Sequence, residues 1–268
     1  VFMGTGDGDF ADMKAFNTRN DFDGGAPSIL KIGDVNGDGA LDLVTATSSS
    51  VTTLAGLGDG RFTPALAESG LSGLNAAVGD LNGDGHEDIL FESGWYEAPA
   101  TDPFSMPWKL HADWKIHASL PLLVRDLNND GRADVIVGRA HDYVLYWWEQ
   151  SEPSPDGRTT WVEHLIDDRF SQPHSLHWAD LDADGEDELI TGKRVHAHNG
   201  NDPGGNEPPC IYYYKWRSDR QMFERYVIDE GRVGGGLQIR TADLNNDGRL
   251  DIAVAGKSGT YVLFNQGK

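Results

Sequence analysis

One short acidic pattern recurs five times along this chain and limits what the chain can fold into. Its first copy reads Asp34-Val-Asn-Gly-Asp-Gly-Ala-Leu-Asp42, with carboxylate or amide side chains at positions 1, 3, 5 and 9 and glycine at position 6. Later copies begin at Asp80, Asp126, Asp180 and Asp243, so successive starts are 46, 46, 54 and 63 residues apart. A repeat of about 40–50 residues is the size of one blade in a radially repeated β fold.

The side chains at these positions are those that bind a hard cation. Oxygen ligands at positions 1, 3 and 5 converge, the glycine permits a sharp turn, and position 7 offers its backbone carbonyl. An oxygen-only set of this size favours Ca²⁺ over Mg²⁺, which keeps several of its waters. A single such loop could be an ordinary β-turn, whereas repetition in register predicts about one Ca²⁺ per loop. The expected calcium ligands are Asp34, Asn36, Asp38, Asp42, Asp80, Asn82, Asp84, Asp88, Asp126, Asn128, Asp130, Asp134, Asp180, Asp182, Asp184, Glu188, Asp243, Asn245, Asp247 and Asp251.

The residues around each loop have the character of strands. Ile29–Ile32 leads into the first loop and Leu41–Val44 follows it. An EF-hand loop would instead join two helices and close with Glu at position 12. A third strand is expected at runs such as Val51–Leu54, and a fourth at runs such as Trp114–His117. We therefore expect an all-β chain, a β-propeller of four-stranded antiparallel blades.

The two ends of the chain suggest how the blades are completed. Five loops predict five blades within a single domain spanning residues 1–268. The N-terminal segment Val1–Phe10 resembles Leu57–Phe62, which links a third strand to a fourth, and the C-terminal segment Asn265–Lys268 follows a third strand. The N-terminal strand is therefore expected to complete the last blade and close the ring. The alternative is a fragment of a seven-bladed propeller, with further blades or domains outside this sequence.

Charge and composition exclude some classes of partner. The formal net charge is −21, and because binding to nucleic acid requires a basic face, no nucleic-acid partner is expected. No run approaches the roughly 18 apolar residues of a membrane span. The chain begins at Val1, and we expect a processed, secreted protein, extracellular or periplasmic. The single Cys210 excludes an intrachain disulfide and leaves a structural thiol or a nucleophile open.

A second set of candidate residues lies in loops at the other end of the blades. Variable loops on a rigid scaffold are where ligands usually bind, and the longest of these loops, Gly192–Gly204, carries cations, imidazoles and an acid. Such groups could form an acid–base site or hold a zinc ion at the histidine loop, and the alternative is a solvated polar loop. The candidate catalytic residues are His174, His177, Lys193, Arg194, His196 and His198. The candidate ligand-binding residues are Trp95, Tyr96, Arg139, His141, Asn199, Asp202 and Arg240.

Other polar and aromatic residues are open to a structural interpretation. His117 and His164 occupy equivalent places in fourth strands, and we expect both to be structural. Trp95 and Tyr96 could stack on a sugar ring or pack at a blade edge, because aromatic rings serve both purposes.

The acidic loops and the strands that follow them resemble the FG-GAP or VCBS repeats of integrin alpha-chain heads and many bacterial secreted proteins. Gly94–Glu97, His174–Leu181 and Thr191–Gly204 look like segments of the propellers of aldos-2-ulose dehydratase and of rhamnose–glucuronate lyases. Those enzymes act on sugars by β-elimination and have seven blades. The resemblance implies a funnel site with histidine as base or metal ligand, and with Arg or Lys holding a carboxylate or oxyanion.

Two functions remain open at this point. The first is a secreted calcium-binding β-propeller that binds carbohydrate or protein ligands on the face opposite the calcium loops. The second is a carbohydrate-active lyase or dehydratase, in which a base removes a proton next to a carbonyl or carboxylate and cations stabilise the enolate.

Overall fold

The structure is a computed structural model that describes residues 29–46, 50–69, 76–104, 106–116, 121–155 and 158–267. The chain divides into two compact units, Val1–Ser119 and Leu120–Lys268. Both units are built from antiparallel sheets in which each strand pairs with the next one along the chain. No helix within the described ranges has the length and apolar character needed to cross a membrane.

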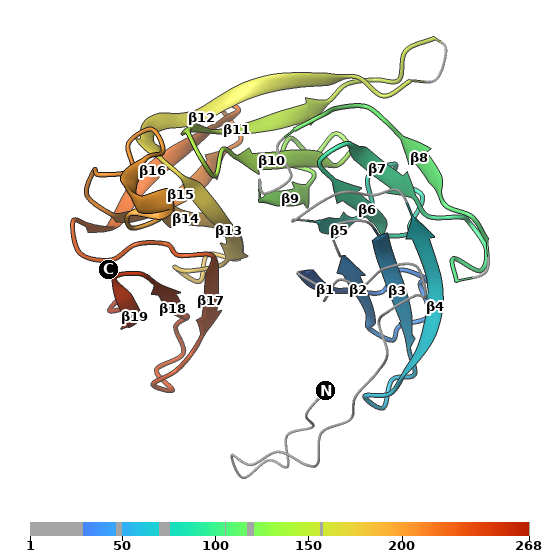
Figure 1. Ribbon diagram of the computed structural model, residues 1–268, viewed down its shortest axis with the longest axis horizontal. Helices are drawn as coiled ribbons and strands as arrows, with labels where there is room; N and C mark the ends of the chain where they lie inside the picture. The colour runs from blue at the N-terminus through green and yellow to red at the C-terminus, as the bar shows by residue number, and fades with distance from the viewer. Residues whose placement is uncertain are drawn as a thin grey trace. The chain divides into compact units, whose positions relative to one another are not determined.

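The N-terminal unit contains two four-stranded sheets (Figure 1). The first sheet consists of β1 (Ile29–Gly33), β2 (Asp42–Ala46), β3 (Ser50–Gly56) and β4 (Phe62–Ser69). The second consists of β5 (Ala77–Gly79), β6 (Asp88–Phe91), β7 (Gly94–Glu97) and β8 (Lys109–His111). Between them lies a core in which Val44, Ile89 and Trp108 are buried.

The fourth strand of the second sheet differs from the prediction. It is β8 rather than the run that begins at Trp114, and residues 112–116 lie outside any strand. The earlier run is favoured because Lys109 and His111 both bond Glu97 of the neighbouring strand, at 2.9 and 2.6 Å. Trp114 instead donates its Nε1–H to the carbonyl of Phe91 at 2.8 Å. His117 lies outside the described residues.

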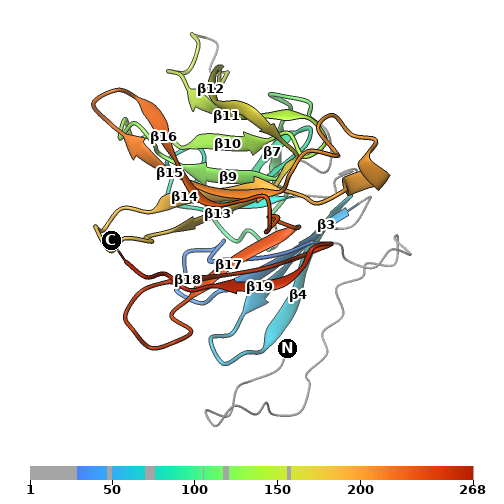
Figure 2. The same ribbon diagram turned by 90° about the vertical axis from the view of Figure 1, so that its left-hand side faces the viewer.

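The C-terminal unit contains three sheets. The first consists of β9 (Leu122–Arg125), β10 (Asp134–Gly138), β11 (Tyr143–Gln150) and β12 (Trp161–Ser171). The second consists of β13 (Pro173–Ala179), β14 (Glu188–Lys193), β15 (Cys210–Arg217) and β16 (Met222–Glu230). The third consists of β17 (Gln238–Ala242), β18 (Asp251–Gly256) and β19 (Gly259–Leu263). β13 contacts both β9 and β17, so the three sheets of this unit lie side by side (Figures 1 and 2).

Burial within these sheets follows from the position of each strand. Every residue of the second strands β10 and β14 is buried, and these strands contain apolar runs of Val, Ile and Leu. In β16, at the edge of its sheet, only Phe223 and Asp229 are buried. Apolar side chains from adjacent sheets, among them Ile136, Leu189 and Tyr214, fill the space between the first two sheets of the C-terminal unit.

The prediction of an all-β chain built from β-propeller blades is confirmed. Four of the sheets have four antiparallel strands, and the fifth has three within the described residues. The segment predicted to complete the last blade, Val1–Phe10, lies outside the described residues. Closure by that segment and the seven-bladed alternative therefore stay predictions.

Candidate functional site

The order of strands places the acidic loops and the variable loops at opposite ends of each sheet. An acidic loop joins the first strand of a sheet to the second, as at Asp180–Glu188 between β13 and β14. The next connection, which carries the 3₁₀ turn Ala197–Gly200, must return at the other end because the strands are antiparallel (Figure 2). We call this other end the distal face.

The position-1 aspartate organises each acidic loop. In the third loop, Asp126 accepts the backbone N–H groups of Asp130 at 3.2 Å and Gly131 at 2.9 Å. In all five loops the bond from the position-6 glycine is 2.8–3.0 Å long. These glycines have φ between 84° and 92°, a left-handed conformation that side chains disfavour. The turn predicted from the sequence is therefore present in every copy.

The position-9 carboxylate has a second, unpredicted role. In four of the loops it is fully buried and accepts two backbone N–H groups, one from position 2 and one from a residue at the end of the third strand or up to two residues after it. In the third loop Asp134 bonds Leu127 and Gln150, both at 2.9 Å. The four carboxylates are Asp42, Asp88, Asp134 and Asp251. Through these bonds each carboxylate connects its loop to the end of the third strand, and it also adds negative charge to the loop.

Electrostatics at these carboxylates favours a bound cation. Burial, together with the charges of neighbouring loop acids, raises the pKa of Asp88 to about 7 and that of Asp134 to about 6, despite the backbone hydrogen bonds that each accepts. Burial likewise raises the pKa of Asp42. A divalent ion would offset the repulsion among these clustered acids. The donor set of these loops therefore fits calcium.

On the distal face, five side chains from two connections and the start of β13 meet in what we call the histidine cluster. His141 follows β10, His174 opens β13, and the loop after β14 supplies Arg194, His198 and Asp202. Asp202 lies at the centre, with one carboxylate oxygen 3.0 Å from His198 Nδ1 and the other 3.3 Å from His141 Nδ1. The rings of His141 and His198 are stacked with centroids 4.7 Å apart. His174 meets His141 edge to face at 5.7 Å.

Arg194 brings positive charge to this cluster. Its Nη2 donates to the carbonyl of Ala140 at 3.1 Å and lies 3.3 Å from His141 Nδ1 and 3.7 Å from Asp202. Its buried Nε has no hydrogen-bond partner among the described residues. A guanidinium with an unused donor is suited to bind an oxyanion or carboxylate.

The surroundings set the protonation of the cluster. Burial, with the nearby Arg194 charge, lowers the pKa of His174 to about 4. Burial also lowers the pKa of His141. Although burial raises the pKa of Asp202, the hydrogen bonds from His198 and His141 outweigh this and lower it. His174 is therefore a neutral imidazole at neutral pH and Asp202 is a carboxylate.

Lys193 is connected to the cluster by hydrogen bonds to Gln172 and to the Arg194 carbonyl. Its side chain is buried, with the residue 1% exposed, and Nζ donates to Gln172 Oε1 at 3.0 Å and to the Arg194 carbonyl at 3.2 Å. Gln172 in turn donates to Asp202 at 3.1 Å. Lys193 is thus held inside the protein instead of facing a ligand. Gln172 was not predicted, and no motif in the sequence points to it.

A cavity of about 500 Å³ opens beside the cluster. Its lining includes the charged or polar side chains of Arg194, His198 and Lys257 and the apolar side chains of Leu237 and Ala255. A hollow that combines an apolar wall with a few charged donors is the usual form of a small-ligand site.

Several predicted residues lie apart from the cluster. His177 bonds Thr241 at 2.9 Å, and Arg240 on the same strand as Thr241 is exposed. His196 lies at the start of the 3₁₀ turn with an exposed ring, and Asn199 is an exposed residue within that turn. Arg139 is exposed and lies over the ring of Tyr146 at 5.6 Å, a separate cation–π contact.

The aromatic candidates for sugar stacking are packed inside the N-terminal unit. Trp95 is 2% exposed and stacks on His111 at 4.1 Å, and Tyr96 is 8% exposed. Of the two open interpretations, packing is the one that their burial favours. His164 is also structural, because it stacks on Trp147 at 4.4 Å and bonds Glu149 at 2.7 Å.

The lone thiol is structural as well. Cys210 is buried, and burial raises the pKa of its thiol, which opposes formation of a nucleophilic thiolate.

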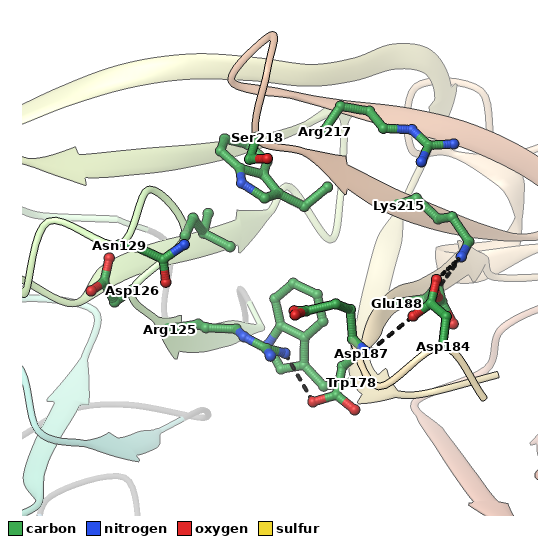
Figure 3. A pocket seen from close by; sticks show the side chains of 13 residues that line it. Arg125, Asp126, Asn129, Trp178, Asp184, Asp187, Glu188, Lys215, Arg217 and Ser218 are labelled. Atoms are coloured by element: carbon green, nitrogen blue, oxygen red, sulfur yellow. Dashed lines mark hydrogen bonds and ion pairs between the residues drawn. The ribbon is translucent and has the colours of Figure 1, made fainter. Parts of the chain in front are cut away.

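At the acidic-loop end, a second cavity of about 320 Å³ lies between the third and fourth loops (Figure 3). Arg125, just before the third loop, pairs with Asp187 of the fourth at 2.9 Å and covers the ring of Trp178 at 4.9 Å. Lys215 enters from the other side (Figure 3). Sequence reasoning missed this cavity because its lining comes from four separate segments.

Comparison with known proteins agrees with this architecture. A sequence profile described as the FG-GAP-like repeat matches residues 34–91 and 126–191, which contain the first four acidic loops. No curated protein sequence matches the chain significantly. A solved structure with a similar fold is a lectin from Agrocybe aegerita, determined to explain its specific recognition of non-reducing terminal N-acetylglucosamine. The two share 18% identity with a TM-score of 0.54, and the match covers 90% of this chain and 63% of the lectin chain.

Proposed function

This chain carries FG-GAP-like repeats folded as β-propeller blades, and on that premise we propose that it is a secreted calcium-binding protein that binds carbohydrate on its distal face. The observation that carries the proposal is the histidine cluster beside the 500 Å³ cavity, at the end of the blades opposite the acidic loops. The lectin with a similar fold recognises a sugar, which supports carbohydrate over protein as the ligand.

The charges of the cavity favour a sugar that carries a carboxylate. Arg194 has an unused donor within the described structure and Lys257 lies on the same rim. A carboxylate bound by a guanidinium forms charge-assisted hydrogen bonds, each worth about 1.5–3 kcal/mol. The apolar wall of Leu237 and Ala255 suits the non-polar face of a sugar ring.

Calcium binding is proposed for the acidic loops because their donors are oxygens in the calcium pattern and their buried acids have raised pKa values. The residues that would hold the ion are those at positions 1, 3, 5 and 9, with the backbone carbonyl of position 7. Extracellular calcium modules bind with dissociation constants of about 10⁻⁴–10⁻³ M, which suits an extracellular or periplasmic location.

A binding experiment tests the carbohydrate proposal. Titration of the full chain with uronate-containing and neutral oligosaccharides should show preference for the acidic sugars. Arg194→Met should then weaken binding at least about tenfold, the loss expected for one charge-assisted contact. Arg220→Met is the matched control, because Arg220 is an exposed arginine in the turn between β15 and β16, at the other end of the sheet. Equal affinity of the Arg194 variant and the wild type would contradict the proposal.

A second candidate function is β-elimination on an acidic sugar. It is favoured by His174, a neutral imidazole with a pKa of about 4 beside the positive charge of Arg194. Such a ring can accept a proton at neutral pH, although it is a weaker base than an ordinary histidine. New ultraviolet absorbance from an unsaturated uronate, lost in His174→Gln while sugar binding persists, would support a lyase. No absorbance change across a broad panel would leave binding as the function.

Zinc at the histidine loop is a further proposal for the same cluster. Donor atoms of His141, His198 and Asp202 all lie within 4.8 Å of one another and are of the types that zinc prefers. The Arg194 guanidinium, 3.3 Å from His141 Nδ1, opposes a second cation there. Metal analysis of protein purified without chelator tells whether the cluster holds zinc. About one zinc per chain would support the metal site, and no bound zinc would contradict it.

A further inference from the structure

The fourth acidic loop differs from the others in containing a lysine side chain. Lys215, on β15, extends its ammonium group among the acids of this loop (Figure 3). Nζ lies 2.6 Å from Asp182, 2.7 Å from Asp184 and 3.1 Å from Glu188, which are positions 3, 5 and 9. The side chain is only 11% exposed, so these carboxylates surround most of its charge.

Strand register shows that this lysine is specific to one blade. Leu189 of β14 pairs with Tyr214, so Lys215 lies opposite the position-9 residue Glu188. The residues at the corresponding place in the other four sheets include no lysine: they are Ala55, Glu97, Glu149 and Phe264. In the third loop the contrast is a reversal of charge, because Glu149 accepts a hydrogen bond from the position-3 residue Asn128 at 3.1 Å.

Arginines near two other loops do not take the same place. Arg132 contacts the position-5 carboxylate of Asp130, and Arg249 contacts that of Asp247 at 2.8 Å. Among the loop acids described, these arginines engage position 5, whereas Lys215 engages positions 3, 5 and 9 together. The arginine-bearing loops therefore have no ammonium or guanidinium shared among positions 3, 5 and 9 within the described residues.

The lysine and a calcium ion compete for the same oxygens. Calcium needs several oxygens at about 2.3–2.6 Å, and the Lys215 ammonium already lies within hydrogen-bonding distance of three of the expected ligands. Lysine is protonated at neutral pH, and two cations about 3 Å apart would repel strongly. The lysine supplies the neutralising charge that a metal would otherwise bring.

We propose that Lys215 occupies the cation position of the fourth loop, so that the chain binds calcium in its other four loops and closes this one without metal. The inference rests on the proposed calcium binding of those other loops. The proposal also bears on the distal face. Strand β14 begins at Glu188 of this loop and ends at Lys193, next to Arg194 of the histidine cluster. The blade that carries most of the histidine cluster would then hold its acidic loop together at low calcium.

Counting bound ions tests the proposal. Native mass spectrometry of the full chain, freed of metal and then titrated with calcium, should show four ions for the wild type. Lys215→Met removes the ammonium but keeps an unbranched side chain, and it should raise the count to five. Lys115→Met is the matched control, because Lys115 is an exposed lysine in a segment outside any strand, and it should leave the count at four.

A reciprocal variant covers the case in which Lys215→Met does not fold. Glu149→Lys places an ammonium at the equivalent position of the third loop and should lower the count to three, with circular dichroism confirming the sheet content. Five ions in the wild type, or no gain in a folded Lys215→Met, would overturn the proposal while calcium binding stands. An unchanged count in a folded Glu149→Lys would also overturn it. No bound calcium in any protein would remove the proposed calcium function and this inference together.

Discussion

His174 links the electrostatics of the histidine cluster to a measurable pH dependence of stability. Its pKa in the folded chain is about 4, against 6.5 for the free side chain, because burial and Arg194 disfavour the charged ring. Below pH 6.5 the unfolded chain therefore binds a proton that the folded chain does not, and stability falls as the pH drops toward 4. From pH 7.5 to 4.5 this linkage removes about 2.5 kcal/mol of the free energy of unfolding.

His174→Gln deletes this titration. Urea unfolding in EDTA at pH 7.5 and 4.5 should show the variant gaining about 2.5 kcal/mol relative to the wild type on acidification, whatever its stability at pH 7.5. His196→Gln is the control, since His196 lies in the neighbouring loop with an exposed ring, and it should follow the wild-type pH dependence. Parallel curves for His174→Gln and the wild type would refute the argument.

Three substitutions test the backbone and hydrogen-bond contacts of the sheets. Gly94 has φ of 133°, and a Cβ there would meet the His111 carbonyl oxygen at 1.9 Å, so Gly94→Ala should cost at least about 3 kcal/mol in urea unfolding. Gly58→Ala, at φ of 72° with open space around it, should cost about 1 kcal/mol, and similar losses in both variants would contradict the steric reasoning. Tyr214→Phe removes a buried hydroxyl bonded to Asp167 at 3.0 Å and should lose about 1–2 kcal/mol by the same measurement, so an unchanged stability would contradict this role.

The acidic loops could be predicted from sequence because the pattern is local. Asp126 and Gly131 lie within six consecutive residues, and the bond between them closes the turn without help from elsewhere. The full role of Asp134 could not be predicted in this way. One of its amide partners, Gln150, lies sixteen residues away at the end of another strand, and only pairing of β10 with β11 brings the two together.

The histidine cluster was predicted in part, for a reason that strand geometry explains. His141 and His198 lie in connections on the same end of neighbouring sheets, so residues 57 apart in sequence come to stack on each other. His177 is three residues beyond His174 in the same strand, and the pairing of this strand with β14 shifts its register between Pro173 and Leu176. His177 does not join the cluster and bonds Thr241 instead.

The contact of Lys215 with the fourth loop could not be predicted from the acidic pattern in the sequence. The fourth loop matches the acidic pattern as well as its neighbours do, yet a side chain 27 residues after its last acid changes its chemistry. Register between β14 and β15 decides where that lysine lies, and the register is known only from the folded sheet.

Thermal unfolding of the full chain in excess calcium and in excess EGTA tests most directly whether the acidic loops are metal sites. A ligand present at 100 times its dissociation constant stabilises the folded state by about 2.7 kcal/mol per site. For units of this size that corresponds to roughly 5–10 °C in Tm per saturated loop. We predict a clearly lower Tm in EGTA that recovers when calcium is restored, and superimposable melting curves would contradict the account.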